Sequence, residues 1–146
     1  QYDLHVLMRF DLERALLSGD LAPEDLPAAW DDRFEADFAR RPPDAARGCL
    51  QDVHWSEGLI GYFPTYSLGN LAAAQIAAAM QRDLPDLAEA FARGDFAAAL
   101  AWLRPRIHAR ARTAPAAEIL ADATGAAAGW DEGPLLAHLE AKFAPA

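Results

Sequence analysis

The abundance of alanine most restricts what this 146-residue sequence can fold into. The chain contains 35 alanines but two valines and four isoleucines, and its β-branched residues form no alternating run. Alanine has the highest helix propensity, whereas β-branched residues are enriched in strands. The sequence therefore predicts an all-α protein, with residues 1–146 forming a single helical segment.

Apolar residues recur every three to four positions, which is the spacing of one helical face. We expect Gly19 to end the first helix, and Pro105 to kink a later one or to begin a new turn. Trp30, Phe34 and Phe38 should form the buried face of the second helix. The predicted helices cover residues 2–18, 22–39, a short stretch at 45–55, 65–82, 84–93, 96–112, 113–125 and 131–144.

Two of these helices have inward faces that the spacing predicts residue by residue. The face predicted for the first helix consists of Leu4, Leu7, Met8, Leu12, Ala15 and Leu16. The face predicted for the last helix consists of Leu135, Leu136, Leu139 and Phe143.

The net charge of −9 and the pI near 4.7 argue against a nucleic-acid partner or an anionic membrane, since both attract basic surfaces. Hydrophobic residues make up 53% of the chain, which predicts a packed core. The sequence has no apolar run of about 18 residues, the length that a membrane-spanning helix needs. We therefore expect a soluble, cytoplasmic protein with no membrane partner.

Cys49 is the single cysteine, so neither an internal disulfide nor a cysteine-based zinc site is expected. Its apolar neighbours Leu50 and Val53 argue against a nucleophilic thiol. We expect His5 to be a hydrogen-bonded residue on a helix face, and His108 and His138 to lie on the surface. The HExxH, P-loop, GxGxxG and GxSxG motifs do not occur, so the chain alone has no recognisable metal-ligand set or complete catalytic apparatus.

Residues 48–66, with the sequence GCLQDVHWSEGLIGYFPTY, concentrate the polar and aromatic chemistry of the chain. A carboxylate such as Asp52 can fix the tautomer of His54. The hydroxyls of Tyr62 and Tyr66 and the imidazole N–H of His54 are suitable donors to a developing oxyanion. Two interpretations stay open from spacing alone, namely a binding or catalytic site and a polar, aromatic junction between helices.

The stretch GCLQDVHW at 48–55 matches Gly-x-x-Gln-Asp-x-His-Trp, and it resembles a signature of the thermostable carboxypeptidase Taq family of zinc metallocarboxypeptidases. The flanking sequences are also similar to that family, in the same order, over essentially the whole chain. The resemblance is carried by YDLHVLMRFDLERALLSGDL, LPAAWDDRF, QDVHWSEGLIGYFPTYSLGNLAAAQ and DLPDL, and it weakens over residues 114–146.

The resemblance implies a helical, deep-cleft metallopeptidase fold like that of the neurolysin and peptidyl-dipeptidase group. Such enzymes remove C-terminal residues from peptide substrates with broad specificity. The metal, zinc or cobalt, is held by two histidines of HExxH and a downstream glutamate, all upstream of the part that this chain resembles. The resemblance therefore implies a C-terminal segment that supplies one wall of the cleft and is inactive alone.

The family motif transfers roles to matching positions only. By analogy with the related cleft peptidases, His54 and Tyr62 are the expected catalytic residues, which contact the peptide carbonyl or oxyanion. Gln51, Asp52, Trp55 and Tyr66 are the expected substrate-binding residues. We expect Asp52 to orient His54 or a neighbouring helix. No residue of the chain is expected to bind the metal.

The chain starts without methionine, with its apolar pattern already running at residue 2, which predicts a segment cut from a longer protein. Its expected partners are the missing N-terminal part of the same enzyme and, through a homodimer, a second copy. The alternative from another class is a non-catalytic helical interaction or dimerisation module. The alanine-rich stripe of helix 65–82 is one surface suited to self-association.

Overall fold

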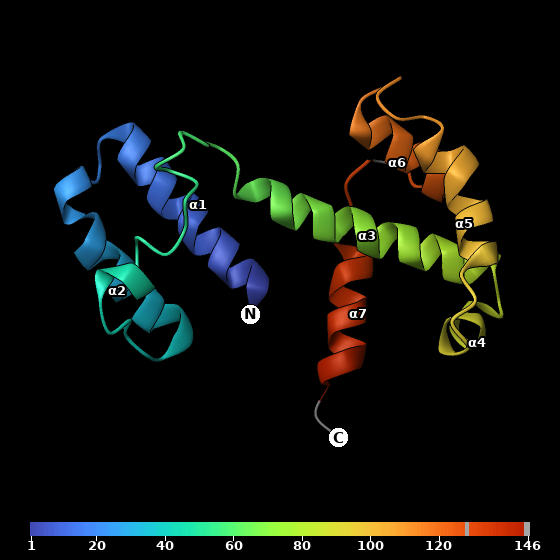
Figure 1. Ribbon diagram of the computed structural model, residues 1–146, viewed down its shortest axis with the longest axis horizontal. Helices are drawn as coiled ribbons and strands as arrows, with labels where there is room; N and C mark the ends of the chain where they lie inside the picture. The colour runs from blue at the N-terminus through green and yellow to red at the C-terminus, as the bar shows by residue number, and fades with distance from the viewer. Residues whose placement is uncertain (128, 145–146) are drawn as a thin grey trace. The chain divides into compact units, whose positions relative to one another are not determined.

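The computed structural model describes residues 1–127 and 129–144. These residues contain helices and turns but no strand, which confirms the predicted all-α fold (Figure 1). The chain divides into two compact units, Gln1–Ser67 and Leu68–Ala146. The elements are α1 (Tyr2–Ser18), η1 (Pro23–Asp25), α2 (Leu26–Phe38), η2 (Ala45–Arg47), α3 (Pro64–Asp83), α4 (Leu87–Ala92), α5 (Ala97–Leu103), η3 (Arg104–His108), α6 (Ala116–Thr124) and α7 (Gly133–Phe143).

The core of the first unit is built from α1, α2 and the segment after η2. Trp30 is the most deeply buried of its aromatic residues, with 1% of its surface exposed. The buried cluster consists of Met8, Leu12, Trp30, Phe34 and Cys49, with Phe38 and Trp55 packed against it. The face predicted from the spacing of Trp30, Phe34 and Phe38 is therefore confirmed. Gly19 ends α1 as predicted, with a φ of +82° that glycine adopts without strain.

The inward face of α1 differs from the prediction. Met8 and Leu12 are buried, but Leu4 and Leu7 are 44% and 49% exposed. Two charged residues, Arg9 and Glu13, are buried instead, with 6% and 3% of their surfaces exposed. A buried charge is stable only when it is paired and hydrogen-bonded. The partners of Arg9 and Glu13 lie in the segment that carries His54, as described below.

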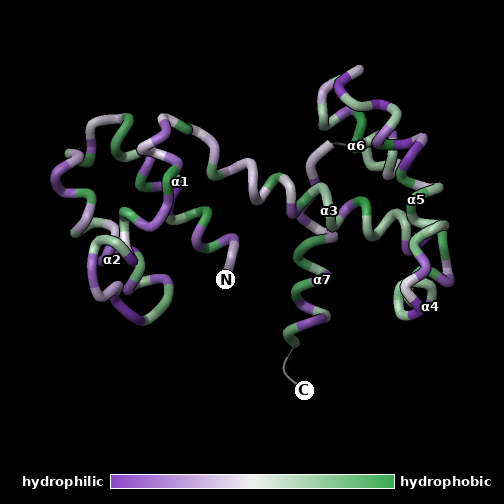
Figure 2. Tube along the Cα trace, viewed as in Figure 1, coloured by the Kyte–Doolittle hydropathy of each residue, from purple (hydrophilic) through white to green (hydrophobic). Residues whose placement is uncertain are grey.

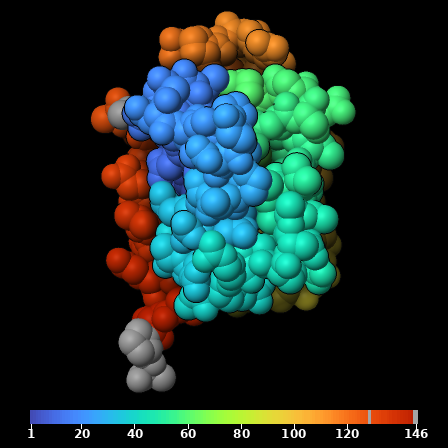
Figure 3. Space-filling view, turned by 90° about the vertical axis from the view of Figure 1, so that its left-hand side faces the viewer, coloured from blue at the N-terminus to red at the C-terminus, as the bar shows by residue number. Residues whose placement is uncertain are grey.

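The short helix predicted over residues 45–55 does not form. Ala45–Arg47 make a single 3-10 turn, which Asp44 caps by accepting a hydrogen bond from the Arg47 N–H at 2.9 Å. Residues 48–63 then continue as turns. The side chains of Asp52 and Trp55 bond to α1, and this tertiary pairing overrides local helix propensity. Figure 3 shows the first unit, with the turquoise surface of this segment continuous with the blue surface of the preceding helices.

The second unit has its own core around α3, α5 and α6. Its buried cluster consists of Ala79, Met80, Leu87, Ala99, Trp102 and Ala123. The indole N–H of Trp102 donates to Asp83 at 2.8 Å, which ties α5 to the end of α3. The break expected at Pro105 is confirmed, because α5 ends at Leu103 and residues 104–108 form a π-helical turn. Figure 2 shows hydrophobic and hydrophilic residues interspersed along the helices.

The predicted inward face of α7 is wrong at three of its four positions. Leu136, Leu139 and Phe143 are 52%, 37% and 70% exposed. Leu135 is partly buried and lines the pocket shared with α3, together with small residues such as Ala137 and Ala141. Among the described helices, none is both long and apolar enough to cross a membrane.

Candidate functional site

The site centres on residues 48–66, which we call the site segment. Its first fixed point is Asp52, which pairs with Arg9 of α1 at 2.5 Å. The guanidinium of Arg9 also donates to the His5 carbonyl at 2.9 Å, and its Cζ lies 4.6 Å from the ring centre of Trp30. Such stacking suits the planar, delocalised charge of arginine. Arg9 therefore holds the site segment against both α1 and α2.

Glu13, one turn further along α1, provides the second and third fixed points. One carboxylate oxygen accepts the indole N–H of Trp55 at 2.8 Å. The other accepts the backbone N–H of Gly61 at 2.7 Å. Gly61 has a φ of +74°, which glycine adopts without strain and other residues rarely adopt. The single carboxylate of Glu13 thus joins two turns of the site segment.

His54 lies between these fixed points and contacts the start of α3. Its Nε2 is 3.0 Å from the hydroxyl of Tyr66, and one of the two groups donates the shared proton. The His54 ring is 4.6 Å from Phe63, which is buried at 3% exposure. His54 Nδ1 is buried and has no hydrogen-bond partner among the described residues. The ring is therefore packed on one side and keeps one unused polar atom.

Tyr62 joins the same cluster of rings. Its ring centre is 5.5 Å from that of His54 and 5.4 Å from that of Tyr66, and 42% of its surface is exposed. Tyr2 of α1 meets Tyr66 edge-on at 6.3 Å. The structure thus brings His54, Tyr62 and Tyr66 together. His54 forms its direct hydrogen bond with Tyr66, whereas the family resemblance named Tyr62 as the second catalytic residue.

The remaining predicted site residues have separate environments. Asp52 contacts α1 through Arg9 and Trp55 contacts α1 through Glu13, so both side chains fix the segment in place. Gln51 is exposed, and its backbone N–H donates to the Gly48 carbonyl at 3.2 Å. Cys49 is buried, and burial raises the pKa of its thiol, which keeps the thiol neutral.

Arg9 and Glu13 were not among the site residues predicted from the sequence. Charged residues on a helix usually face solvent, so neither was assigned to the site. A signal is present in their spacing, because Val6, Arg9 and Glu13 follow the three- and four-residue intervals of one helical face. Val6 is buried as well, so Arg9 and Glu13 continue a buried stripe along α1.

Two titratable groups of the first unit, Tyr66 beside His54 and His5 beside Arg9, have shifted pKa values. Burial raises the pKa of Tyr66 above its usual value, and the nearby Tyr62, Tyr2 and Asp52 act in the same direction. Tyr66 therefore keeps its hydroxyl proton at neutral pH and is available as a donor. Burial lowers the pKa of His5, and the charge of Arg9 adds to the effect. The His5 ring stacks on Phe38 at 4.1 Å.

The described residues contain no group of three His, Cys, Asp or Glu side chains placed to hold a metal ion. The ring neighbours of His54 are Tyr62, Phe63 and Tyr66. The carboxylates of Asp52 and Glu13 accept hydrogen bonds from Arg9, Trp55 and Gly61. These donors do not fit a metal centre. The chemistry open to the cluster is hydrogen bonding to a polar ligand.

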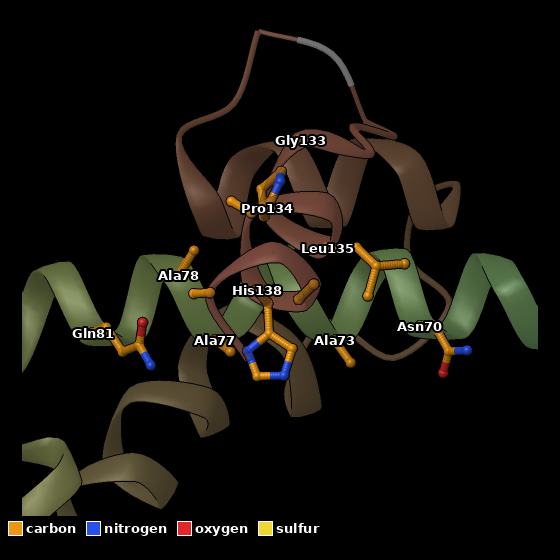
Figure 4. A pocket seen from close by; sticks show the side chains of 12 residues that line it. Asn70, Ala73, Ala77, Ala78, Gln81, Gly133, Pro134, Leu135 and His138 are labelled. Atoms are coloured by element: carbon orange, nitrogen blue, oxygen red, sulfur yellow. The ribbon is translucent and has the colours of Figure 1, made fainter. Parts of the chain in front are cut away.

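A separate pocket of about 710 Å³ lies between α3 and α7 in the second unit (Figure 4). Asn70 and Gln81 stand at opposite ends of the α3 wall, with His138 of α7 between them (Figure 4). Alanines form most of the α3 wall, and His138 is exposed as the sequence predicted. The predicted site residues are not among those that line this pocket.

Comparison with known proteins places this chain in a family. The family model described as carboxypeptidase Taq (M32) metallopeptidase matches residues 1–143. Thermostable carboxypeptidase 1 of Thermus thermophilus is 46% identical over 143 residues, which are 98% of this chain and 28% of that protein. Thermostable carboxypeptidase 1 of Pyrococcus furiosus is 42% identical over 85% of this chain and 25% of its own length.

A solved structure agrees with these sequence relatives. The M32 carboxypeptidase from Deinococcus radiodurans R1 has a TM-score of 0.90 and 41% identity, covering 97% of this chain and 28% of that one. The chain therefore belongs to the carboxypeptidase Taq (M32) metallopeptidase family. It spans about a quarter of the length of the curated relatives it matches.

Proposed function

We propose that this chain is part of a metallocarboxypeptidase that hydrolyses C-terminal residues from peptides with broad specificity. The chain supplies one wall of the substrate cleft and is inactive alone. The metal, zinc or cobalt, is held by residues outside the chain and activates the attacking water. The family match and the names of the relatives support the reaction class.

The observation that carries the proposed role is the contact between His54 and Tyr66. Together with the half-exposed Tyr62, these residues offer polar groups from one compact cluster. During peptide hydrolysis, negative charge develops on the oxygen of the scissile carbonyl, and fixed donors stabilise it best. In this proposal His54 and Tyr62 bind that oxygen. Tyr66 orients the His54 ring and adds a substrate contact, with Gln51, Asp52 and Trp55 in the surrounding wall.

Substitution in the full-length enzyme tests the role of each donor. His54→Ala and Tyr62→Phe are each expected to lower kcat by roughly 10²-fold or more, because each removes a donor to the oxyanion. Tyr66→Phe is expected to have a smaller effect if this tyrosine acts through His54. Steady-state kinetics on a short peptide substrate measures these differences.

Tyr2→Phe is a matched control, because it removes the hydroxyl of a tyrosine whose ring also contacts Tyr66. We expect it to leave kcat unchanged. Normal kcat in a correctly folded His54→Ala enzyme would contradict the catalytic assignment and favour the non-catalytic interaction module. A larger loss for Tyr66→Phe than for Tyr62→Phe would exchange the roles of the two tyrosines.

The oligomeric state, the location and the wider fold remain predictions from the family resemblance. We propose a cytoplasmic homodimer with a deep-cleft fold of the neurolysin type. The alanine-lined wall of α3 supports self-association, because small side chains allow close approach of a second helix. Light scattering on the full-length enzyme measures the state directly, and a monomer would contradict it.

A further inference from the structure

Arg9 and Glu13 of α1 make three polar contacts with the site segment, and each lies beside a proposed catalytic residue. Asp52, which pairs with Arg9, is two residues before His54. Trp55, which donates to Glu13, directly follows His54. Gly61, whose backbone N–H also donates to Glu13, directly precedes Tyr62. The fixed points of the turns therefore coincide with the positions where small displacements matter most.

The side chains of Arg9 and Glu13 are almost fully buried, which distinguishes them from the charged side chains of surface ion pairs. Arg9 is 6% exposed and Glu13 is 3% exposed. Exposed ion pairs hold geometry weakly, because solvent competes for both charges. Buried charges lose their hydration and depend on the specific partners that the fold provides. A shift of the site segment by one hydrogen-bond length would separate both charges from their hydrogen-bond partners in that segment.

We propose that Arg9 and Glu13 are positioning residues, which we call the α1 clamp. The clamp fixes the site segment on both sides of His54 and directly before Tyr62, and so sets the distance between the imidazole and the tyrosine hydroxyls. This inference rests on the proposed function of His54 and Tyr62. Neither clamp residue is proposed to touch substrate.

The carboxylate of Glu13 allows a graded test. Its two oxygens serve two donors, the Trp55 indole and the Gly61 N–H. Glu13→Gln keeps the size of the side chain but leaves one acceptor oxygen, so one of the two donors loses its partner. Glu13→Ala removes both acceptors.

In the full-length enzyme we expect Glu13→Gln to lower kcat roughly 10-fold and Glu13→Ala roughly 10²-fold, because misplaced catalytic groups lose transition-state contacts. KM should change by less than about twofold, since binding of the ground state is largely kept. Asp11→Asn is the matched control. It removes an exposed 2.9 Å ion pair between α1 and Arg33 of α2, and kcat should stay at the wild-type value.

A double-mutant cycle with Trp55→Phe separates positioning from general destabilisation. In the Trp55→Phe enzyme, the one oxygen of a glutamine at position 13 has one remaining donor to serve, the Gly61 N–H. The kcat loss caused by Glu13→Gln should therefore be smaller in this background than in the wild type. Equal losses in the two backgrounds would contradict the shared-carboxylate arrangement.

Hydrogen exchange tests the clamp without reference to activity. Amide exchange measured by mass spectrometry on the full-length enzyme should accelerate within residues 52–63 in Glu13→Ala and stay unchanged in the rest of the chain. Unchanged exchange there, or equal acceleration everywhere, would overturn the clamp. If exchange accelerates locally while His54→Ala keeps normal kcat, the clamp stands and the proposed catalytic function fails.

Discussion

Tyr66 shows how a single residue joins packing with chemistry. Its ring meets Tyr2 and Tyr62, while its hydroxyl reaches His54 Nε2 at 3.0 Å. Half-burial raises its pKa, so the protonated form is favoured in the folded protein. The same surroundings that pack the ring therefore keep the hydroxyl in the state that donates a hydrogen bond.

The raised pKa of Tyr66 predicts how stability depends on alkaline pH. The folded pKa lies above the unfolded value of about 10, so the contribution of Tyr66 is fully present below that pH. The contribution is lost as the pH rises through the folded pKa. Urea unfolding at a series of alkaline pH values should therefore show a steeper loss of stability in the wild type than in Tyr66→Phe.

Ultraviolet difference titration provides the independent measurement. The wild type minus Tyr66→Phe difference should show one tyrosine ionising above the usual pKa. Ionisation at or below the usual value would contradict the burial of the hydroxyl at the site.

A motif in the sequence suggested individual site residues, but no pattern suggested the two residues whose burial reverses the usual behaviour of a charged side chain. His54 and Tyr62 belong to a recognisable polar and aromatic stretch. Arg9 and Glu13 look like solvated helix residues until their partners, more than 40 positions away, are known. Periodicity predicted the buried face of α2 but not the whole of those of α1 and α7, and it cannot show that a charge on a buried face is paired.

At the scale of the element, helices with strong periodicity were predicted well and the weaker ones were not. Helix α3 was expected at 65–82 and observed at Pro64–Asp83. The stretch 45–55 contains good helix formers at its start, yet it folds as turns because its side chains bond to α1. Local propensity decides a helix only when tertiary contacts do not compete with it.

The junction between α3 and α5 gives a prediction at this scale. The Trp102 indole donates to Asp83, and this hydrogen bond lowers the pKa of the Asp83 carboxyl, with Arg82 adding to the effect. The stabilising contribution is present above the unfolded pKa of about 4 and is lost as the pH falls through the folded value. Acid unfolding followed by circular dichroism should show a shallower loss of stability in Asp83→Asn than in the wild type.

Trp102→Phe supplies the comparison for this prediction. It removes the indole donor that contributes most to the lowered pKa. In the Trp102→Phe background, Asp83→Asn should therefore change the acid-dependent loss of stability by less than it does in the wild type. An undiminished difference would assign the shift to Arg82 instead.

At the scale of the whole molecule, the chain has two compact units, and the first unit contains the cluster of His54, Tyr62 and Tyr66. It spans 28% of its Thermus thermophilus relative. The family resemblance predicted the fold class and the family, because the motif at 48–55 lies within similar sequence on both sides.

The metal content of the 146-residue chain tests the proposal that residues outside this chain hold the metal. Because the described residues offer no cluster of three ligand side chains, we expect far less than one zinc ion per chain and no peptidase activity. Elemental analysis after dialysis against zinc gives the content. Stoichiometric zinc that is lost in His54→Ala would contradict the proposed role of His54 as a hydrogen-bonding residue.

The three contacts of the α1 clamp also have a consequence for the order of folding. They join residues 43, 42 and 48 positions apart in the sequence, so none of them can form from local structure. A chain must lose the entropy of closing these long loops before the contacts stabilise it. Helices α1 and α2 form contacts over shorter sequence separations, so we expect the proposed site to form late, after the core around Trp30 has assembled.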